Sequence, residues 1–592
     1  MIFGKYINRY YFKYCYMLLF GLISLVTVDC LQLVIPNLYQ MVVNGMIDGV
    51  VTVDGTIVPF DMAFLLDKIC MPMTVVILTM VLGRFLWRVC FFGAAIRVEE
   101  DLRNRMFERA RWLSQSYYQY NKVGSLMSLF TNDLDTVQEC FGWGIMMFFD
   151  AALLGVLAVI KMFRMDPFLT VLSMIPMGLL LACATVIGKS MTRKWDARQE
   201  VFSKLSDFSQ ESFSGVAVIK AFVKEGVELL AFKELNKENE KANIAHTKAS
   251  VLLRILVTLF VESVICIILG YGGYLVYLGR FNAGELVEFM GYFNAVIWPI
   301  MAVSELIDMS SRGRASLLRI QQLLDAQIEI KDSPEAKPLE NARGEITFRD
   351  LTFCYPGGEF DVLENISFTI KAGESIGLVG KTGSGKTTLV DLILRTYNVP
   401  DGSIFIDGQD VNHLTIRSVR ENCAYVPQDN FLFSDTIENN IALGVEEKDP
   451  QAVEQAAILS DVHDNITDFQ NGYHTVLGER GVTVSGGQKQ RISIARALMK
   501  NAAVLILDDS VSAVDTKTEK TILQNLKTIR EGKTTILIAH RISTVEQMDR
   551  ILFLEDGKIS GFDTHENLCK ENEAYRKMVD LQKLEEGGAD HE

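Results

Sequence analysis

The most informative stretch of this 592-residue chain is Ser375-Ile-Gly-Leu-Val-Gly-Lys-Thr-Gly-Ser-Gly-Lys-Thr-Thr388. Its first five residues have the apolar pattern of a short buried strand, and the residues after Thr388 (Leu-Val-Asp-Leu-Ile-Leu) have that of a helix. A strand, a glycine-rich loop and a helix in this order form a phosphate-binding loop. The glycines allow backbone N–H groups to converge on phosphate oxygens at the N-terminus of the helix.

Two side chains of this loop are expected to do chemistry. Lys386 reaches the β- and γ-phosphates of a bound nucleotide, and the hydroxyl of Thr387 supplies an oxygen to Mg²⁺. We therefore predict that the loop binds ATP together with Mg²⁺. The residues predicted to bind the nucleotide are Gly380, Lys381, Thr382, Gly383, Ser384, Gly385, Lys386, Thr387 and Thr388.

A second buried strand, residues 503–507 (Ala-Val-Leu-Ile-Leu), leads directly into Asp508 and Asp509. An acid pair after a strand is, on its own, an ordinary solvated turn. Beside a phosphate-binding loop, however, a carboxylate at the end of a strand is how ATPases of this kind hold Mg²⁺. We therefore predict that Asp508 is a metal ligand.

The N-terminal half contains apolar stretches long enough to cross a bilayer, which takes about 20 residues. Six spans are predicted, at residues 16–43, 69–96, 140–163, 167–188, 255–279 and 285–306. Lys5, Arg9 and Lys13 precede the first span, whereas the first outer loop carries acids and no base. Because the basic side of a membrane protein is cytosolic, we expect a multi-pass protein of the cytoplasmic membrane with both termini in the cytosol.

The two inner loops, about 97–139 and 189–254, are long and rich in helix-forming residues. Each has one interruption, at 117–124 and at 212–220, where a short transverse helix is expected to touch a cytosolic partner. Asp29, Arg84 and Glu262 fall well inside the apolar stretches. A charge there is costly unless it faces a partner or water, so these side chains either line a substrate cavity or form buried ion pairs.

Composition excludes several other classes of protein. Hydrophobic residues make up 49% of the chain, which excludes a disordered protein. The net charge of −15 argues against a nucleic-acid partner, because such proteins normally present a basic face. The ten cysteines are scattered without a CxxC pair, which favours buried, reduced thiols over a metal site or a disulfide framework.

The stretch Ser485-Gly-Gly-Gln488, about 100 residues after the phosphate-binding loop, resembles the signature motif of ABC-transporter ATPases. The other motifs of that family are matched in order. Tyr355 resembles the adenine-stacking aromatic, Gln428 the Q-loop, 478–481 (Gly-Glu-Arg-Gly) the X-loop, 512–515 (Ser-Ala-Val-Asp) the D-loop and His540 the switch histidine. Residues 215–222 and Trp298-Pro299 resemble the transmembrane pattern of ABC exporters.

This resemblance implies an all-α six-helix transmembrane domain followed by an α/β P-loop ATPase domain. It implies an interfacial segment at 1–15, a transmembrane domain at 16–325, a linker at 326–343, an ABC nucleotide-binding domain at 344–580 and an acidic tail at 581–592. Within the ATPase, Gln428 is expected to bind the metal with Thr387 and Asp508. Asp509, His540 and Gln428 are the expected catalytic residues, and Tyr355 is expected to bind the adenine. Ser485, Gly486, Gly487 and Gln488 are expected to bind the ATP of a second chain.

One membrane domain and one ATPase domain make a half-transporter, which must pair with a second half. Where the family has a catalytic glutamate after Asp508, this chain has Asp509, whose side chain is shorter by one methylene. The change is either a harmless swap in a homodimer or the mark of a hydrolytically weak site in a heterodimer. With an intact signature motif, the second pattern resembles one subunit of the bacterial heterodimeric multidrug exporters.

The expected function is ATP-driven export of amphipathic small molecules across the lipid bilayer. A lipid or peptide exporter of the same architecture, or an ATP-gated channel or sensor, are the alternatives that the sequence leaves open.

Overall fold

The computed structural model describes residues 4–53, 56–478, 481 and 483–589. It divides the chain into two compact units. The first comprises residues up to 111 together with 123–326, and the second comprises 112–122 together with the residues from 327 onward. The C-terminal unit therefore includes a short piece of chain that lies more than 200 residues upstream of the rest of it.

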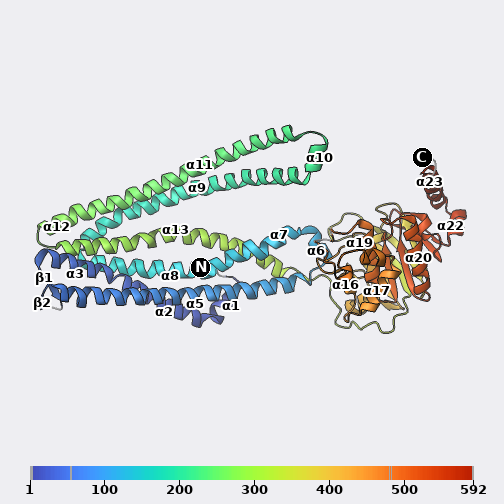
Figure 1. The fold of residues 1–592 in the computed structure, drawn as a ribbon, viewed down its shortest axis with the longest axis horizontal. Coiled ribbons are helices and arrows are strands. Elements are labelled where there is room, and N and C mark those ends of the chain that lie inside the picture. The colour runs from blue at the N-terminus through green and yellow to red at the C-terminus, as the bar shows by residue number, and fades with distance from the viewer. Residues whose placement is uncertain (1–3, 54–55, 479–480, 482, 590–592) are drawn as a thin grey trace. The chain divides into compact units, whose positions relative to one another are not determined.

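Helices make up nearly all of the first unit (Figure 1). They are α1 (Asn8–Lys13), α2 (Cys15–Gln32), α3 (Ile35–Asp48), α4 (Met62–Phe64), α5 (Met71–Ala110), α7 (Val123–Ser128), α8 (Leu134–Met165), α9 (Pro167–Ser214), α10 (Val216–Ala221), α11 (Glu225–Ile267), α12 (Gly273–Tyr277) and α13 (Ala283–Asp325). Short π-helical turns, η1 (Leu65–Cys70), η2 (Leu129–Asp133) and η3 (Ile268–Gly272), join consecutive helices into longer rods. The first outer loop contains a hairpin of β1 (Val50–Val53) and β2 (Thr56–Pro59).

Six helical stretches of the described chain are long and apolar enough to cross a membrane. They run over Cys15–Asp48, Met62–Ala110, Val123–Met165, Pro167–Ser214, Glu225–Tyr277 and Ala283–Asp325. Each contains one predicted span, except that the fifth ends at Tyr277 rather than at residue 279. The prediction of six spans is therefore confirmed.

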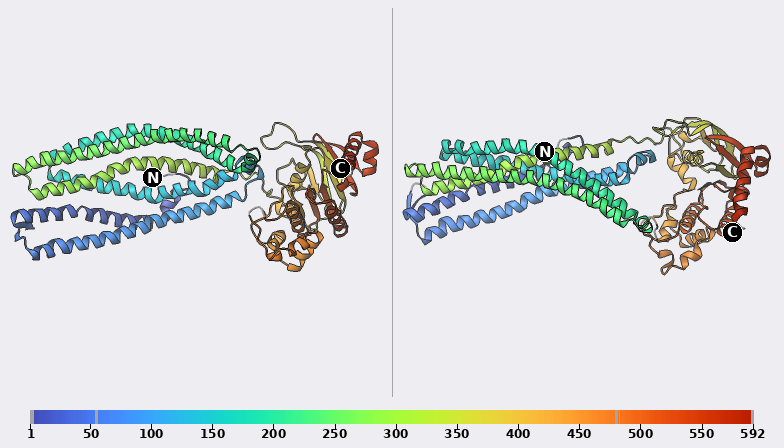
Figure 2. Two further views of the ribbon diagram at one scale, coloured as in Figure 1. Left: turned by 45° about the horizontal axis from the view of Figure 1, so that its top comes forward. Right: turned by 90° about the horizontal axis from the view of Figure 1, so that it is seen from above.

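The helices continue far beyond the apolar stretches, as the long inner loops predict. Helix α9 has 48 residues and α11 has 43, about twice the length that a bilayer needs. These two helices run side by side (Figure 2) and are joined by α10, which occupies the second predicted interruption. The side chains around α10 are apolar and open to solvent, with Phe213 77% and Phe222 70% exposed.

Helix α1 is tied to two other helices by polar contacts. The Asp101 carboxylate on α5 accepts a hydrogen bond from Arg9 at 2.9 Å and lies 4.0 Å from Lys13. At the C-terminal end of α13, Asp325 accepts hydrogen bonds from Lys5 at 2.7 Å and from Tyr6 at 2.6 Å. The N-terminal segment is therefore bound to this unit by its charges as well as by buried Ile7 and Tyr10.

Two β-sheets form the centre of the second unit. A four-stranded antiparallel sheet has the order β4 (Leu363–Ile370), β3 (Ile346–Phe353), β6 (Ile404–Ile406) and β7 (Gln409–Asp410). A six-stranded sheet has the order β12 (Lys558–Asp563), β11 (Arg550–Glu555), β5 (Ser375–Gly380), β10 (Thr534–Ile538), β9 (Val504–Asp508) and β8 (Cys423–Val426). All neighbouring strands of the larger sheet are parallel except β11 and β12. Strands β9 and β10 are buried along their whole length, as strands of a covered parallel sheet are.

Helices surround these sheets. They are α6 (Gln115–Tyr120), α14 (Lys386–Ile393), α15 (Ile416–Glu421), α16 (Ile437–Ala442), α17 (Pro450–Leu459), α18 (His463–Thr467), α19 (Gly486–Met499), α20 (Thr516–Ile529), α21 (Ile542–Val545), α22 (His565–Glu571) and α23 (Glu573–Ala589). Two 3₁₀ turns, η4 (Val411–His413) and η5 (Gly472–His474), complete the unit. Because α23 runs to Ala589, the predicted acidic tail at 581–592 is helical over most of its length.

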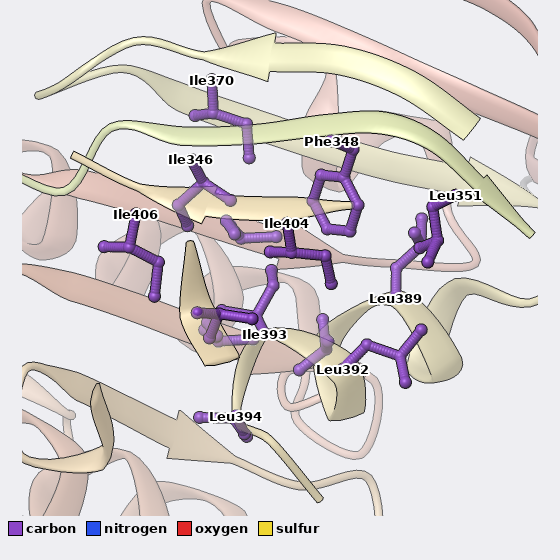
Figure 3. Close-up of a cluster of buried hydrophobic side chains, with 14 of the residues drawn as sticks. Ile346, Phe348, Leu351, Ile370, Leu389, Leu392, Ile393, Leu394, Ile404 and Ile406 are labelled. Carbon is purple, nitrogen blue, oxygen red and sulfur yellow. The ribbon is translucent and has the colours of Figure 1, made fainter. Parts of the chain in front are cut away.

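The core between the two sheets holds the phosphate-binding loop in place. Leu389, Leu392 and Ile393 of α14 are almost fully buried and extend into a cluster with Ile346 and Ile404 of the smaller sheet (Figure 3). Burial of an aliphatic side chain stabilises a fold by roughly 1.5–3 kcal/mol. The helix that follows the loop is therefore fixed by its apolar face, which keeps its N-terminus in one position.

Candidate nucleotide-binding site

The carboxyl ends of four parallel strands bring most of the predicted site residues together. The phosphate-binding loop follows β5, Gln428 follows β8, Asp508 and Asp509 stand at the end of β9, and His540 follows β10. Since these strands are parallel and adjacent in the order β5-β10-β9-β8, their carboxyl ends meet at one edge. Ligands of open α/β sheets bind outside that edge.

The loop between β5 and α14 has the backbone that its glycines predict. Gly385 has φ +97°, and a Cβ there would lie 2.7 Å from Cδ2 of Leu363 and 3.2 Å from the Val362 carbonyl. A side chain at this position would both strain the backbone and collide with β4. Gly385 therefore lets the N-terminus of α14 come close to the rest of the loop.

Lys386 lies inside the curve of the loop. Its ammonium group donates to the carbonyl oxygens of Gly380 and Lys381, both at 2.9 Å, and its side chain is only 6% exposed. Burial lowers the pKa of Lys386, and the Asp508 and Asp509 carboxylates act against that shift. The hydroxyl of Ser384 is buried without a hydrogen-bond partner among the described residues. A buried ammonium and an unpaired donor in one loop fit the phosphates of a nucleotide.

Asp508 and Thr387 form the predicted metal pair. Asp508 is 2% exposed, it lines the same cavity as Thr387, and its Oδ2 has no hydrogen-bond partner in the described chain. Burial raises the pKa of Asp508, while Thr387, Lys386 and His540 act in the opposite direction. A hydroxyl and a free carboxylate oxygen beside phosphate groups are donors that suit Mg²⁺. The residues present therefore fit that ion.

A cavity in front of this pair is lined by Thr387, Gln428 and Asp508. The structure thus brings together the three residues predicted to bind the metal. Asp509, the next residue, has φ +47° and donates its N–H to the Ile538 carbonyl at 2.9 Å. Its own carbonyl accepts a hydrogen bond from Gln490 of α19 at 3.2 Å.

The predicted adenine-binding residue is held by other aromatic rings. The ring of Tyr355 meets that of Tyr397 edge-on, with centroids 5.0 Å apart, and its hydroxyl lies 2.8 Å from that of Thr388. Tyr397 in turn accepts a hydrogen bond from Gln119 of α6 at 3.0 Å. Tyr120, also on α6, donates to the carbonyl of Pro356 at 2.7 Å.

Helix α6 occupies the first predicted interruption of the inner loops. Gln119 and Tyr120 of this segment contact Tyr397 and the Pro356 carbonyl, which belong to the same compact unit as the segment itself.

The signature motif begins helix α19. The Ser485 hydroxyl accepts from the Gln488 N–H at 3.3 Å, and the Gln488 side chain accepts from the Ser485 N–H at 2.9 Å, which is a capping box. Ser485 and Gly486 are exposed, and a Cβ at Gly486 would meet no atom within 4 Å. None of these four residues lines the cavity that collects Thr387, Gln428 and Asp508. Of the X-loop match, Glu479 and Arg480 lie outside the described residues.

Comparison with known proteins gives two family matches that divide the chain in the same way. The family described as the ABC transporter transmembrane region matches residues 18–300, and the family described as ABC transporter matches residues 363–512. A probable multidrug resistance ABC transporter ATP-binding/permease protein of Bacillus subtilis, YheI, is 35% identical over 99% of this chain and 98% of its own length.

The chain belongs to the ABC transporter family.

This ABC transporter is also similar to a lipid flippase and to an exporter of known structure. An ATP-dependent lipid A-core flippase of Syntrophus aciditrophicus is 35% identical over 82% of this chain and 80% of its own length. Among solved structures, a bacterial Atm1-family ABC exporter with ATP bound has a TM-score of 0.76 and 26% identity, covering 97% of this chain and 98% of that one. The chain is thus a multi-pass membrane protein with an ATPase domain coupled to transport, and the predicted fold is confirmed.

Two charged residues of the transporter's membrane part, Asp29 and Arg84, lie near enough to interact electrostatically. Asp29 is 1% exposed, and its side chain lies near a second carboxyl, that of Asp150. Asp150 also accepts a hydrogen bond from the indole N–H of Trp298 at 2.7 Å. Arg84 and Glu262 are exposed on this chain.

Three glutamines of the ATPase unit make contacts that no sequence motif predicts. Gln119 reaches Tyr397, Gln490 joins α19 to Asp509 and to the Ala513 N–H, and Gln582 contacts the backbone around His540. Each links segments that lie far apart in the sequence. Sequence reasoning had no signal for Gln119 or Gln582, whereas Gln490 was identifiable only as a neighbour of the signature motif.

Proposed function

We propose that this chain is one half of a two-chain exporter of amphipathic small molecules. Its own ATP site is proposed to be hydrolytically weak, so that the second half is a different protein. Residues 16–325 are assigned to transport, 344–580 to ATP binding, and 326–343 to the link between them. Similarity to a protein named as a multidrug resistance transporter supports the substrate class.

Two exposed surfaces, the N-terminus of α19 and the apolar side chains around α10, support the proposal of a second chain. Ser485 and Gly486 present a helix N-terminus to open space, where backbone N–H groups favour an anion. We assign this anion to the γ-phosphate of ATP on the second chain. The exposed apolar side chains around α10, which include Phe213 and Phe222, offer a second surface for that chain.

Each residue of the proposed site has a defined task. Tyr355 stacks on the adenine, Lys386 holds the β- and γ-phosphates, and Thr387, Gln428 and Asp508 hold the metal. Mg²⁺ bound there neutralises charge on the phosphates. Gln428 and His540 orient the groups around the γ-phosphate, and Asp509 occupies the place of the residue that polarises the attacking water.

The proposal of a weak site rests on the short side chain and the fixed backbone of Asp509. Its side chain is one methylene shorter than glutamate, and its backbone is fixed by the bonds to Ile538 and Gln490. The carboxylate is therefore held back from the γ-phosphate with no backbone freedom to compensate. A displacement of about 1 Å at a catalytic group costs on the order of 100-fold in rate.

The test is steady-state ATP turnover by the purified complex with Asp509→Asn. Asparagine is the suitable replacement, because it tolerates the positive φ at this position better than alanine does. We expect most of the turnover to remain, whereas removal of the corresponding carboxylate in the second chain lowers it by roughly 100- to 10,000-fold. If Asp509→Asn abolishes turnover to the same degree, the site is fully catalytic and the chain is half of a symmetric dimer.

Lipid export is the second candidate, and the similarity to a lipid A-core flippase favours it. Inverted vesicles separate the two. Uphill, ATP-dependent accumulation of a lipophilic dye supports small-molecule export, whereas transfer of a labelled lipid between leaflets without dye accumulation supports a flippase. ATP-dependent flux only down a gradient would identify a channel and contradict both.

A further inference from the structure

We propose that Gln582, on the C-terminal helix α23, is a positioning residue for His540 and thereby controls the rate of ATP hydrolysis at this chain's own site. The proposal rests on the role of His540 given above. Gln582 touches neither the nucleotide loop nor the metal pair, so it acts only through the histidine.

The side-chain amide of Gln582 bridges two backbone groups on either side of Arg541. Its Nε2 donates to the His540 carbonyl at 2.7 Å, and its Oε1 accepts from the Ile542 N–H at 2.8 Å. Strand β10 has ended at Ile538 and helix α21 begins at Ile542, so this piece of backbone has no sheet or helix partner for these groups. Asparagine and glutamine are the side chains that offer a donor and an acceptor in one planar group.

The opposite side of the same segment is held by Glu519 of α20. This carboxylate is 5% exposed, accepts a hydrogen bond from the Thr544 hydroxyl and lies 3.8 Å from the Arg541 guanidinium. The backbone of residues 540–544 is thus fixed between α20 and α23. The exposed imidazole of His540 projects from this fixed backbone and is close enough to Asp508 to influence its pKa.

Helix α23 is rigid enough to serve as the support. Tyr575 is fully buried, its ring packs edge-on against Phe553 with centroids 5.5 Å apart, and its hydroxyl lies 2.9 Å from Nδ1 of His565. Val579, one turn further along, is 4% exposed in the same core. Gln582 follows on the next turn, so its position is set by this anchored part of the helix.

Loss of the bridge should change the rate without changing nucleotide affinity. In Gln582→Leu the Ile542 N–H and His540 carbonyl lose their partners, and the segment around the histidine is then held only by the contacts of Thr544 and Arg541 with Glu519. Because a 1 Å displacement of a catalytic group costs on the order of 100-fold, we expect the rate to fall by about 10- to 100-fold. The ATP concentration at half-maximal rate should stay within about twofold, because the phosphate and adenine contacts lie elsewhere.

Gln582→Glu gives a readout that a purely structural role would not produce. The ionised carboxylate still accepts from Ile542 but faces the His540 carbonyl with a second oxygen. The protonated form regains an O–H donor for that carbonyl. Repulsion from that carbonyl oxygen raises the pKa of this carboxyl above the ordinary glutamate value of about 4.3. The rate relative to wild type should therefore rise several-fold as the pH falls from 8 toward 5. Lys583→Leu, an exposed neighbour on the same helix, should show neither effect.

The experiment is single-turnover release of phosphate from radiolabelled ATP, in complexes whose second chain lacks its catalytic carboxylate, so that only this chain's site reports. Thermal unfolding of each variant is measured in parallel. If His540→Ala slows release but both Gln582 variants match wild type at every pH, the positioning proposal is wrong and the proposed site stands. If His540→Ala leaves release unchanged, the assigned role of His540 is wrong and the positioning proposal fails with it.

Discussion

At the scale of single residues, Lys386 is a buried ammonium group within the phosphate-binding loop. Its ammonium group is tied to two carbonyl oxygens and lies near the Asp508 and Asp509 carboxylates. Lys386→Ala removes the positive charge that meets the phosphates. Because a hydrogen bond to a charged group contributes about 1.5–3 kcal/mol, ATP affinity at this site should fall by roughly 10- to 100-fold.

The measurement is binding of a fluorescent ATP analogue to the purified complex. Lys570→Ala, which removes an exposed lysine on α22, is the matched control and should bind as wild type does. Unchanged affinity of the Lys386→Ala complex for the analogue would show that the loop has been assigned wrongly.

Asp391 makes the stability of the ATPase unit depend on pH. Burial, reinforced by the Asp508 carboxylate, raises the pKa of Asp391 to about 6. The folded chain therefore keeps a proton that the unfolded chain releases near pH 4, so the stabilisation is full below about pH 4 and is lost as the pH rises to about 6. Asp391→Asn should raise the free energy of unfolding by up to about 3 kcal/mol at pH 7 and leave it unchanged near pH 4.

Thermal unfolding of the purified complex at the two pH values measures this difference. Asp580→Asn, an exposed acid on α23, is the control and should unfold like wild type at both. Equal melting temperatures of wild type and Asp391→Asn at pH 7 would contradict the assigned burial effect.

Residues of the site differ in how far the sequence could predict them. The phosphate-binding loop was predictable because its strand, glycines and helix are contiguous and each has a local physical role. Asp29 was visible as a costly charge within an apolar stretch, but nothing in the sequence places Asp150 near it, because that depends on how α2 packs on α8. Gln582 lies 42 residues from His540 in the sequence, and an amide on a surface helix has no distinguishing pattern.

At the scale of elements, one carboxylate makes most of the polar contacts of helix α1. Asp101 meets Arg9 and Lys13 of α1, the Tyr10 hydroxyl, and Arg105 on its own helix at 3.0 Å. Asp101→Asn weakens all of these contacts at once, while the neighbouring Glu100→Gln changes an exposed side chain. We expect trypsin to cut after Arg9 or Lys13 at least several-fold faster in the first variant, because α1 then detaches more often.

Mass spectrometry of the first tryptic fragments measures that rate. Equal cleavage in Asp101→Asn and Glu100→Gln would mean that buried Ile7 and Tyr10 hold α1 without the charges.

Elements were predictable where periodicity is strong. The six spans and their long helical extensions follow from runs of apolar residues and the near absence of helix breakers between them. The hairpin β1–β2 was not predicted, because its strands are only four residues long and lie in a loop. The sequence predicts a contact for this part of the inner loop, but not that residues 112–122 belong to the ATPase unit. Nothing in the sequence shows that Gln119 and Tyr120 meet the aromatic rings near the predicted adenine site.

At the scale of the whole molecule, Gly486 tests the need for a second chain. A Cβ at this position meets no atom within 4 Å, so Gly486→Gln should leave the folding of this chain and its own ATP binding unchanged. The added side chain blocks the N–H groups of α19 from the ATP of the second chain. Turnover at that second site should then fall by at least about tenfold.

Trapping of labelled ATP in the closed complex identifies which site has turned over. Thermal unfolding and ATP binding at this chain's own site serve as internal controls. Loss of turnover confined to this chain's own site would contradict the assignment of the signature motif to the second chain.

The ATPase unit is built from two separate segments of the chain, and this affects the order in which its parts are synthesised and can fold. Residues 112–122 leave the ribosome about 275 residues before Tyr397, which at roughly 5–20 residues per second is an interval of about 14–55 seconds. During that interval four membrane-spanning stretches still have to be inserted, while the tyrosines of α6 stay in the cytosol without the surface they will cover. Membrane insertion must therefore be complete before the cytosolic unit can finish folding, and α6 is the segment on which a chaperone has the longest time to act.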